Sequence, residues 1–437
     1  MRHVTPDEAA GEIRTFDSLC LPLGPGQPPR FLEALGRRKD WEELRIVGSL
    51  LSVLSDVFVH PNVHYLSGFF SPIERILRDS GANIGFAPAD FRRGIPLMAT
   101  LKPRVLATAA APPDADGFCS LSLHAGATVA ELHLAASEPD RMVIVEVSDK
   151  FPRTYGAGGE YHRLHVDEID LLIESDGAPI LVEDPPPSDV DRAIAEHVRG
   201  FIPEGATLQT GIGSIPSLIA GLLAEGDGGD YGVHSEMFTT GLMQLHEAGK
   251  VTNRKGQWDG VSVATFAAGT QALYEWLHEN REVAFLPVDL VNSPETISRN
   301  RRCVTINGAL SIDIHGQVVA DTIAGAQYSG IGGHEDFVSV PALSAEARSL
   351  LCFPSTTEIG GELRSRIVPW FPAGAVITTP RHQVDVVVTE YGAAELQGLT
   401  VHQRGLALAA IAHPAFRDEL VAAAERASHG HSALPPA

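Results

Sequence analysis

An apolar run passes directly into a glycine-rich segment in the stretch Thr207-Leu208-Gln209-Thr210-Gly211-Ile212-Gly213-Ser214-Ile215-Pro216. The first four residues are typical of a short buried strand. Two further polar segments also follow predicted strands, at residues 231–237 and 327–337. In α/β sheets, ligands lie beyond the carboxyl ends of the strands, where glycines let backbone N–H groups approach them. These segments therefore indicate ligand-binding turns, and plain tight turns are the alternative.

Short apolar runs alternate with helical patterns along most of the chain. The predicted strands cover residues 45–48, 56–59, 105–108, 142–147, 207–210, 261–266, 283–288, 303–306, 350–353, 375–378 and 385–389. Several lack polar–apolar alternation, which indicates burial on both faces of a sheet. The clearest helix covers residues 188–201, with Ser188 or Asp189 as its cap and Gly200 and Pro203 at its end. This alternation predicts the α/β fold class with largely parallel sheets.

A proline-rich segment, Glu183-Asp184-Pro185-Pro186-Pro187-Ser188, offers the best domain boundary. Consecutive prolines keep the chain extended and continue neither a helix nor a central strand. We therefore expect an N-terminal domain over residues 1–184 and a C-terminal domain over residues 188–437.

The charge balance excludes several classes of partner. The 437 residues include 33 Lys+Arg and 55 Asp+Glu, a formal net charge of -22. Nucleic acids and anionic membranes need a basic surface, so we expect neither as a partner, whereas a small anion needs only a local pocket. The four cysteines form no CxxC pair, which is typical of reduced thiols. No secretory signal and no apolar run of about 18 residues is visible, so we expect a cytoplasmic protein.

Common nucleotide, hydrolase and metal motifs are absent from the sequence. The turns at 211–216 and 330–335 both lack the third glycine of GxGxxG, and no GxxxxGK[ST], GxSxG or HExxH occurs. His60 and His64 have helical spacing, but Pro61 between them disfavours a helix. We therefore predict no dinucleotide and no metal site.

Two acidic residues have settings suited to catalysis, Glu236 and Glu390. Each follows an apolar run beside glycine, where a carboxylate can act as base, metal ligand or nucleophile. A helix N-terminal glutamate that complements the helix dipole is the structural alternative. Spacing and periodicity alone leave the choice open.

Many separate stretches, taken in order, resemble the acetyl-CoA hydrolase/transferase family, which includes 4-hydroxybutyrate, butyrate and acetate CoA-transferases. The similarity runs from about Leu23 to Val421. Besides the three segments above, it includes residues 26–28, 68–70, 116–120, 151–154, 287–292, 306–310, 354–356, 366–369, 389–392 and 412–417.

The resemblance implies two CoA-transferase-type (NagB/RpiA-like) α/β domains with the active site between them. It implies that Glu236, in the C-terminal domain, is the nucleophile and that Glu390 is a supporting or structural residue. It further implies oxyanion donors in the backbone N–H groups of Ile212 and Gly333 and the side chain of Asn307. Coenzyme A would be bound by Gly211, Gly213, Ser214, Ile215, Pro216, Gly308, Gly330, Ile331 and Gly332. The carboxylic acid would be held by Gln27, Gly68 and Phe69.

The reaction implied is transfer of CoA between short-chain acids such as acetate, propionate, butyrate or 4-hydroxybutyrate, through a covalent glutamyl–CoA thioester. Acyl-CoA and carboxylate are then the substrates, and no permanently bound cofactor is needed. Two rivals are a hydrolase, in which water is the acceptor, and a non-catalytic CoA-binding relative. A homodimer or homotetramer is expected. Glu358 departs from the family, because relatives often have a lysine that meets CoA there.

Overall fold

The computed structural model describes residues 1–158 and 161–428, which form two compact units. Unit 1 contains Met1–Glu183, His234–Thr240 and Gly260–Ser293, and unit 2 contains Asp184–Val233, Gly241–Asp259 and Pro294 onward. The two units are described separately below. Unit 2 begins at Asp184, within the proline-rich segment. The chain does not divide into two units at this one position, however. Two later segments, one of which contains Glu236, belong to unit 1.

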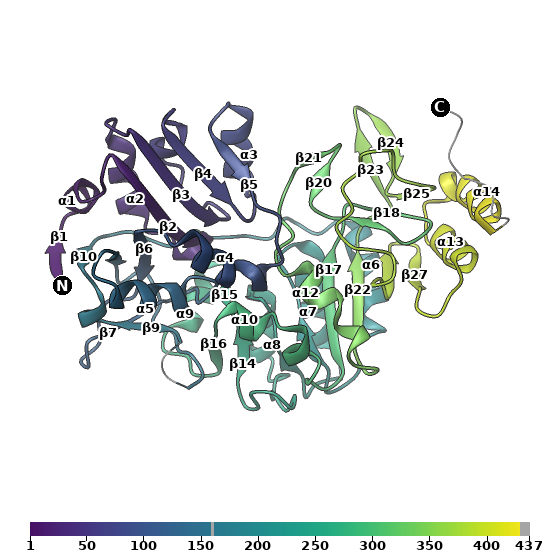
Figure 1. Cartoon of the computed structure of the whole chain (residues 1–437). Helices are drawn as coiled ribbons and strands as arrows, with labels where there is room; N and C mark the ends of the chain where they lie inside the picture. Colours follow the sequence, from purple (N-terminus) through teal and green to yellow (C-terminus); the bar gives the residue numbers. More distant parts are fainter. Residues whose placement is uncertain (159–160, 429–437) are drawn as a thin grey trace. The chain divides into compact units, whose positions relative to one another are not determined.

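Unit 1 is built on an eight-stranded sheet in which every neighbouring pair is parallel. Its strands, in spatial order, are β1 (Arg2–Val4), β10 (Leu171–Glu174), β8 (Met142–Val147), β6 (Val105–Ala110), β2 (Phe16–Leu23), β3 (Glu43–Ser49), β4 (Val63–Ser67) and β5 (Ile84–Phe86). Figure 1 shows β2, β3, β4 and β5 side by side.

Helices and short ladders complete unit 1. The helices are α1 (Pro6–Gly11), α2 (Pro29–Arg37), α3 (Pro72–Asp79), α4 (Gly94–Leu101), α5 (Val129–Ser137), α9 (Gln271–Leu277) and α10 (Val288–Val291). The ladders are β13 (Met237–Phe238) with β15 (Phe266–Ala267), β14 (Ser262–Ala264) with β16 (Val283–Phe285), and β7 (Phe118–Ser120) with β9 (Arg163–His165). The first two ladders are parallel and support the segment around Glu236.

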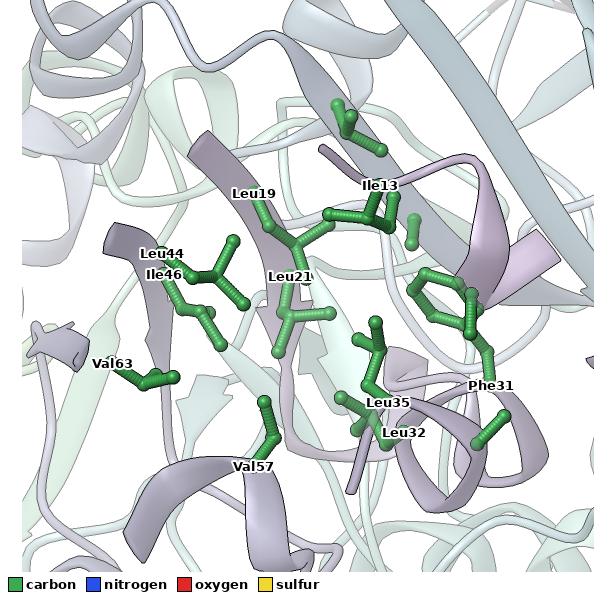
Figure 2. Packing of buried hydrophobic residues seen from close by; sticks show 14 of the residues in the cluster. Ile13, Leu19, Leu21, Phe31, Leu32, Leu35, Leu44, Ile46, Val57 and Val63 are labelled. Carbon is green, nitrogen blue, oxygen red and sulfur yellow. The ribbon is translucent and has the colours of Figure 1, made fainter. Parts of the chain in front are cut away.

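The core of unit 1 forms where α2 packs on the sheet. Figure 2 shows Leu19 and Leu21 of β2 beside Ile46 of β3, with Phe31 and Leu35 of α2 nearby. All five side chains are almost completely buried. Each such burial contributes about 1.5–3 kcal/mol relative to exposure. This packing fixes β2, and Gln27, one of the predicted acid-binding residues, lies in the turn that follows this strand.

Unit 2 contains a six-stranded sheet that is parallel except at one edge. Its strands, in order, are β12 (Gly232–Val233), β11 (Thr207–Gln209), β17 (Cys303–Gly308), β22 (Arg348–Cys352), β26 (Val386–Thr389) and β27 (Gly392–Glu395). Only β27 is antiparallel to its neighbour. The predicted α/β class with largely parallel sheets is therefore confirmed.

The remaining elements of unit 2 surround this sheet. Its helices are α6 (Asp189–Arg199), α7 (Ser214–Glu225), α8 (Thr240–Glu247, which starts at the boundary), α11 (Pro294–Ile297), α12 (His334–Val338), α13 (Val401–Ala410) and α14 (Arg417–Ser428). Its shorter strands are β18 (Ser311–Asp313), β19 (Val318–Val319), β25 (Ile367–Val368), β20 (Thr322–Ile323), β21 (Ala326–Gln327), β23 (Thr356–Ile359) and β24 (Glu362–Ser365).

The predicted helix after the prolines is α6. Ser188 caps it, because the Ser188 hydroxyl accepts the Asp191 N–H while the Asp191 carboxylate accepts the Ser188 N–H. Gly200 ends it. The helix thus forms within the range that the pattern predicted.

Two of the predicted strands are wrong. Residues Asp56–Val59 form a 3-10 turn, η2, which Ser55 caps through its hydroxyl. Residues 375–378 form no strand. At the first place, Val57 and Phe58 are buried from a turn, and at the second, Val376 is exposed; strand-length patterns do not distinguish such apolar runs from strands.

Candidate active site

Glu236 lies in the short link between β12 and β13. Its backbone carbonyl accepts the N–H groups of Thr265, at 2.9 Å, and Phe266, at 3.2 Å. His234 and Ser235 before it are buried, whereas Glu236 is partly exposed. The backbone is thus fixed on both sides of a carboxylate that solvent can reach.

Buried His234 anchors the same segment. Its Nε2 lies 2.7 Å from the Val291 carbonyl oxygen, so Nε2 carries the proton. The Ser235 N–H donates to the Val263 carbonyl at 3.0 Å, beside strand β14. The histidine of this motif therefore positions the glutamate.

Asn292 is the contact that sequence reasoning missed. Its Nδ2 donates to Glu236 Oε2 at 2.6 Å, and Asn292 is completely buried at the end of α10. Helix α10 is itself held because the Val288 N–H donates to the Gly126 carbonyl at 3.0 Å. Residues 287–292 belonged to the resemblance, but the 56 residues that separate Asn292 from Glu236 gave no sign of contact.

Apolar side chains gather next to the glutamate in unit 1. Leu23 and Phe266 are buried, and Leu50, Phe91 and Met237 are partly buried against them. The rings of Phe91 and Phe266 meet edge to face, with centroids 6.5 Å apart. We call these five residues the apolar cluster; a hydrocarbon group would be favoured beside it.

Unit 2 contains a cavity of about 230 Å³ at the carboxyl ends of β11 and β17. Its lining brings together most of the predicted CoA-binding residues with two of the predicted oxyanion donors: Gly211, Ile212, Gly213, Ser214, Ile215, Pro216, Ile306, Asn307, Gly308 and Cys352. We call this the β11–α7 cavity.

Asn307 is oriented by Gln209 on the neighbouring strand. Asn307 Nδ2 lies 3.2 Å from Gln209 Oε1, and Gln209 Nε2 lies 3.3 Å from Asn307 Oδ1. Gln209 is buried and also accepts the Ile306 N–H at 3.1 Å. The reciprocal amide pair fixes which face of the Asn307 amide is turned toward the cavity.

The third glycine-rich segment precedes α12. Gly332 has a φ of +56°, and buried Gly333 is the N-cap residue of α12. Helix α12 packs against β17, the strand that carries Asn307. The segment from Gly330 to Gly333 is not part of the cavity lining, so its predicted contacts with CoA stay predictions.

The predicted acid-binding residues follow β2 and β4 in unit 1. Gln27 is buried, and its amide donates to the carbonyls of Pro22 and Ser49 while its oxygen accepts the Ser52 N–H. These bonds give Gln27 a structural role in joining two turns. Gly68 and Phe69 are partly exposed. Binding of an acid by these three residues stays a prediction.

Glu390 serves the chain itself. Its carboxylate accepts the Ser355 N–H at 2.8 Å and the Ser355 hydroxyl at 2.6 Å. These bonds tie the end of β26 to the turn at Ser355, and a supporting role of Glu390 in catalysis stays a prediction. Arg348, at the start of β22, likewise serves the chain, because it pairs with Asp385 and Glu395, at 3.1 and 2.6 Å.

Glu358, where the sequence departs from the family, lies in a hairpin. Glu358 is exposed on β23, opposite Leu363 of β24, and Gly360 and Gly361 form the turn with φ of +61° and +81°. The Arg364 side chain lies 2.5 Å from Glu362. The nearby Arg364 is thus paired within the hairpin.

A second cavity, of about 550 Å³, lies in unit 1 and is lined by none of the predicted site residues. Within residues 1–158 and 161–428, no cluster of three or more His, Cys, Asp or Glu side chains could hold a metal ion. No helix in that part of the chain is long and apolar enough to cross a membrane.

Comparison with known proteins identifies the family. Residues 269–424 match the model of the acetyl-CoA hydrolase/transferase C-terminal domain. Over 97% of its length, the chain is 35% identical to succinyl-CoA:cyclohexane-1-carboxylate CoA transferase of Geobacter metallireducens, covering 94% of that protein. The chain belongs to the acetyl-CoA hydrolase/transferase family.

Other members agree. This CoA-transferase is 39% identical to the 4-hydroxybutyrate coenzyme A transferase of Clostridium kluyveri, over 71% of this chain and 69% of that one. The crystal structure of RipA from Yersinia pestis superposes with a TM-score of 0.88, at 32% identity, over 98% of this chain and 97% of RipA. The predicted family and the prediction of an enzyme are confirmed.

Proposed function

We propose that this CoA-transferase moves CoA between short-chain monocarboxylic acids through a thioester on Glu236. One observation supports the choice of nucleophile above the others. The Glu236 carboxylate is partly exposed, while its backbone is fixed and one oxygen receives the Asn292 amide at 2.6 Å. A held, reachable carboxylate is suited to attack, because less reorganisation precedes the reaction.

The proposed reaction has two halves. A carboxylate oxygen of Glu236 attacks the thioester carbonyl of acyl-CoA, the C–S bond breaks, and an acyl–glutamyl anhydride and CoA thiolate result. The thiolate attacks the glutamyl carbonyl of the anhydride, which releases the free acid and leaves glutamyl–CoA. A second carboxylate reverses these steps and leaves as the new acyl-CoA.

Each addition places negative charge on a carbonyl oxygen. We assign its stabilisation to the N–H groups of Ile212 and Gly333 and to the Asn307 amide. Loss of one such donor typically slows a reaction about 10²–10³-fold. Gly211, Gly213 to Pro216, Gly308 and Gly330 to Gly332 would contact CoA.

The proposed acids are acetate, propionate, butyrate or 4-hydroxybutyrate. The apolar cluster beside Glu236 favours a hydrocarbon chain over a charged one, because burying an unpaired charge is costly. The 4-hydroxybutyrate transferase among the relatives agrees with this range. Coenzyme A enters and leaves as a substrate, and we further propose a cytoplasmic homodimer or homotetramer.

Trapping the intermediate tests the proposal. The enzyme is incubated with butyryl-CoA, reduced with borohydride and digested, and the peptide containing Glu236 is analysed by mass spectrometry. We expect reduction of Glu236 to the alcohol, and at least about a 10³-fold lower kcat for Glu236→Gln. An active enzyme in which Glu236 stays unmodified would refute the mechanism.

Hydrolysis is the second candidate, because the matching family model includes acetyl-CoA hydrolases. CoA release from butyryl-CoA is measured with and without acetate, together with acetyl-CoA formation. We expect slow thiol release without acetate and rapid acetyl-CoA formation with it. Fast, acetate-independent release without acetyl-CoA would establish the hydrolase.

A further inference from the structure

Asp184 lies directly behind the turn that lines the β11–α7 cavity. Its Oδ1 accepts the Gly213 N–H at 2.8 Å, and its Oδ2 accepts the Ser217 hydroxyl proton. Gly213 is the N-cap residue of α7, and no side chain of the turn caps this helix. A carboxylate from 29 residues earlier in the chain therefore ties the N-cap residue of α7 to the first turn of the helix.

The conformation of the turn makes this contact necessary. Gly213 has φ 121° and ψ 170°, a combination that is accessible essentially to glycine alone. A glycine has many alternatives, so a partner must select this one. Because Asp184 binds both Gly213 and Ser217, the carboxylate fixes the turn to the first turn of the helix.

The other side of the same turn faces the cavity. Ile212, Ser214 and Ile215 all line it, and Ile212 is 47% exposed. Within the described part of the chain, no acceptor takes the N–H groups of Ser214 or Ile215. The turn thus presents N–H groups to the cavity while Asp184 holds it from behind.

We infer that Asp184 is a positioning residue for CoA transfer, which acts by holding the 211–215 turn so that its N–H groups point at the reacting carbonyl. This inference rests on the proposed function, because it assigns the Ile212 N–H to the oxyanion. The Asp184 side chain contacts Gly213 and Ser217, so its role is to hold the turn. Asp184 directly precedes Pro185–Pro187, so its hydrogen bonds connect the proline-rich segment to the 211–215 turn.

Two substitutions of Asp184 distinguish the loss of its hydrogen-bond acceptor from the loss of its negative charge. Asp184→Asn keeps an oxygen for the Gly213 N–H, and its amide can donate to the Ser217 oxygen. Asp184→Ala removes both contacts. Glu183→Gln is the matched control, since Glu183 is an exposed carboxylate that immediately precedes Asp184 in the chain.

We measure kcat and KM for butyryl-CoA and acetate with each full-length enzyme, together with thermal unfolding. For Asp184→Ala we expect a kcat about 10–100-fold lower with little change in either KM, because a misplaced donor weakens the transition state. For Asp184→Asn and Glu183→Gln we expect kcat within about threefold of wild type.

Three results would overturn the inference: an Asp184→Ala enzyme as active as wild type, an equal loss in the Asn and Ala variants, or a change confined to KM. Failure of the proposed function gives a different result. In that case the wild-type enzyme itself would form no acetyl-CoA and no reducible adduct at Glu236.

Discussion

Asn292 supplies Glu236 with a hydrogen bond donor from a helix end that is completely buried. This bond holds one carboxylate oxygen of the proposed nucleophile in a fixed position. The bond thus connects the segment at residues 231–237 to the segment at residues 287–292, which lie far apart in the sequence.

Substitution of Asn292 should change both rate and pH dependence. In Asn292→Ala the donor is lost, and we expect kcat/KM to fall about 10–100-fold, as for other bonds to charged groups. In Asn292→Asp a second carboxylate lies beside Glu236, so the pKa of Glu236 rises and the acid limb of the pH profile moves to higher pH. Asp289→Asn, an exposed change on the same helix, is the control; coincident pH profiles in all three variants would contradict this role.

Leu50 should limit the length of the acyl group. It has a φ of +52°, which is costly for a branched side chain, and it packs into the apolar cluster. Leu50→Gly relieves the backbone and removes the side chain, so we expect kcat/KM for hexanoyl-CoA relative to acetyl-CoA to rise about 10-fold. Leu54→Ala, at a side chain that is 66% exposed in the same loop, should leave that ratio unchanged. An unchanged ratio in Leu50→Gly would place the acyl chain elsewhere.

Among the elements, α2 depends on a carboxylate from the sheet. Glu146 of β8 is buried and accepts the Arg30 and Phe31 N–H groups at 3.2 and 3.0 Å, and the Ser175 hydroxyl at 2.7 Å. Burial raises the pKa of Glu146, although these bonds oppose the shift.

This raised pKa predicts a pH-dependent stability. Between the unfolded pKa of about 4.3 and the raised folded value, the native state binds more protons, so this group's contribution falls as pH rises through that window. Glu146→Gln cannot titrate. We expect the unfolding free energy of wild type minus that of Glu146→Gln to decrease from pH 4 toward neutrality, measured by urea unfolding. A difference independent of pH would show that Glu146 keeps its ordinary pKa.

Local signals predicted some elements and not others. Helix α6 could be predicted because Ser188 and Gly200, its capping residues, lie within the helix's own stretch of sequence. The turn at Asp56–Val59 could not be predicted, since Val57 and Phe58 are buried although this segment pairs with no strand. The turn at 211–216 was identified, but neither Asp184 nor Asn292 was, because their partners are brought near only by the fold.

Across the whole chain, buried histidines link stability to pH in the opposite direction. Burial lowers the pKa of His124 and His334 to about 4 and that of His162 to about 3. The unfolded chain therefore binds more protons below pH 6.5, and stability should fall as pH decreases from there, by up to about 1.4 kcal/mol per pH unit for each imidazole. Denaturant unfolding at pH 7, 6 and 5 measures the loss, and calorimetry in two buffers should show proton uptake. Stability that is flat over this range would mean that these rings are protonated in the native state.

Unit 1 is completed by segments that come late in the chain, since it includes His234–Thr240 and Gly260–Ser293. During synthesis the first 183 residues emerge well before the ladder that surrounds Glu236. Unit 1 therefore cannot be completed until about residue 293 has left the ribosome. Cutting the gene at the prolines would therefore yield a first fragment without Glu236 and a second in which α10, next to Glu236, lacks its hydrogen bond to Gly126 and the sheet of unit 1.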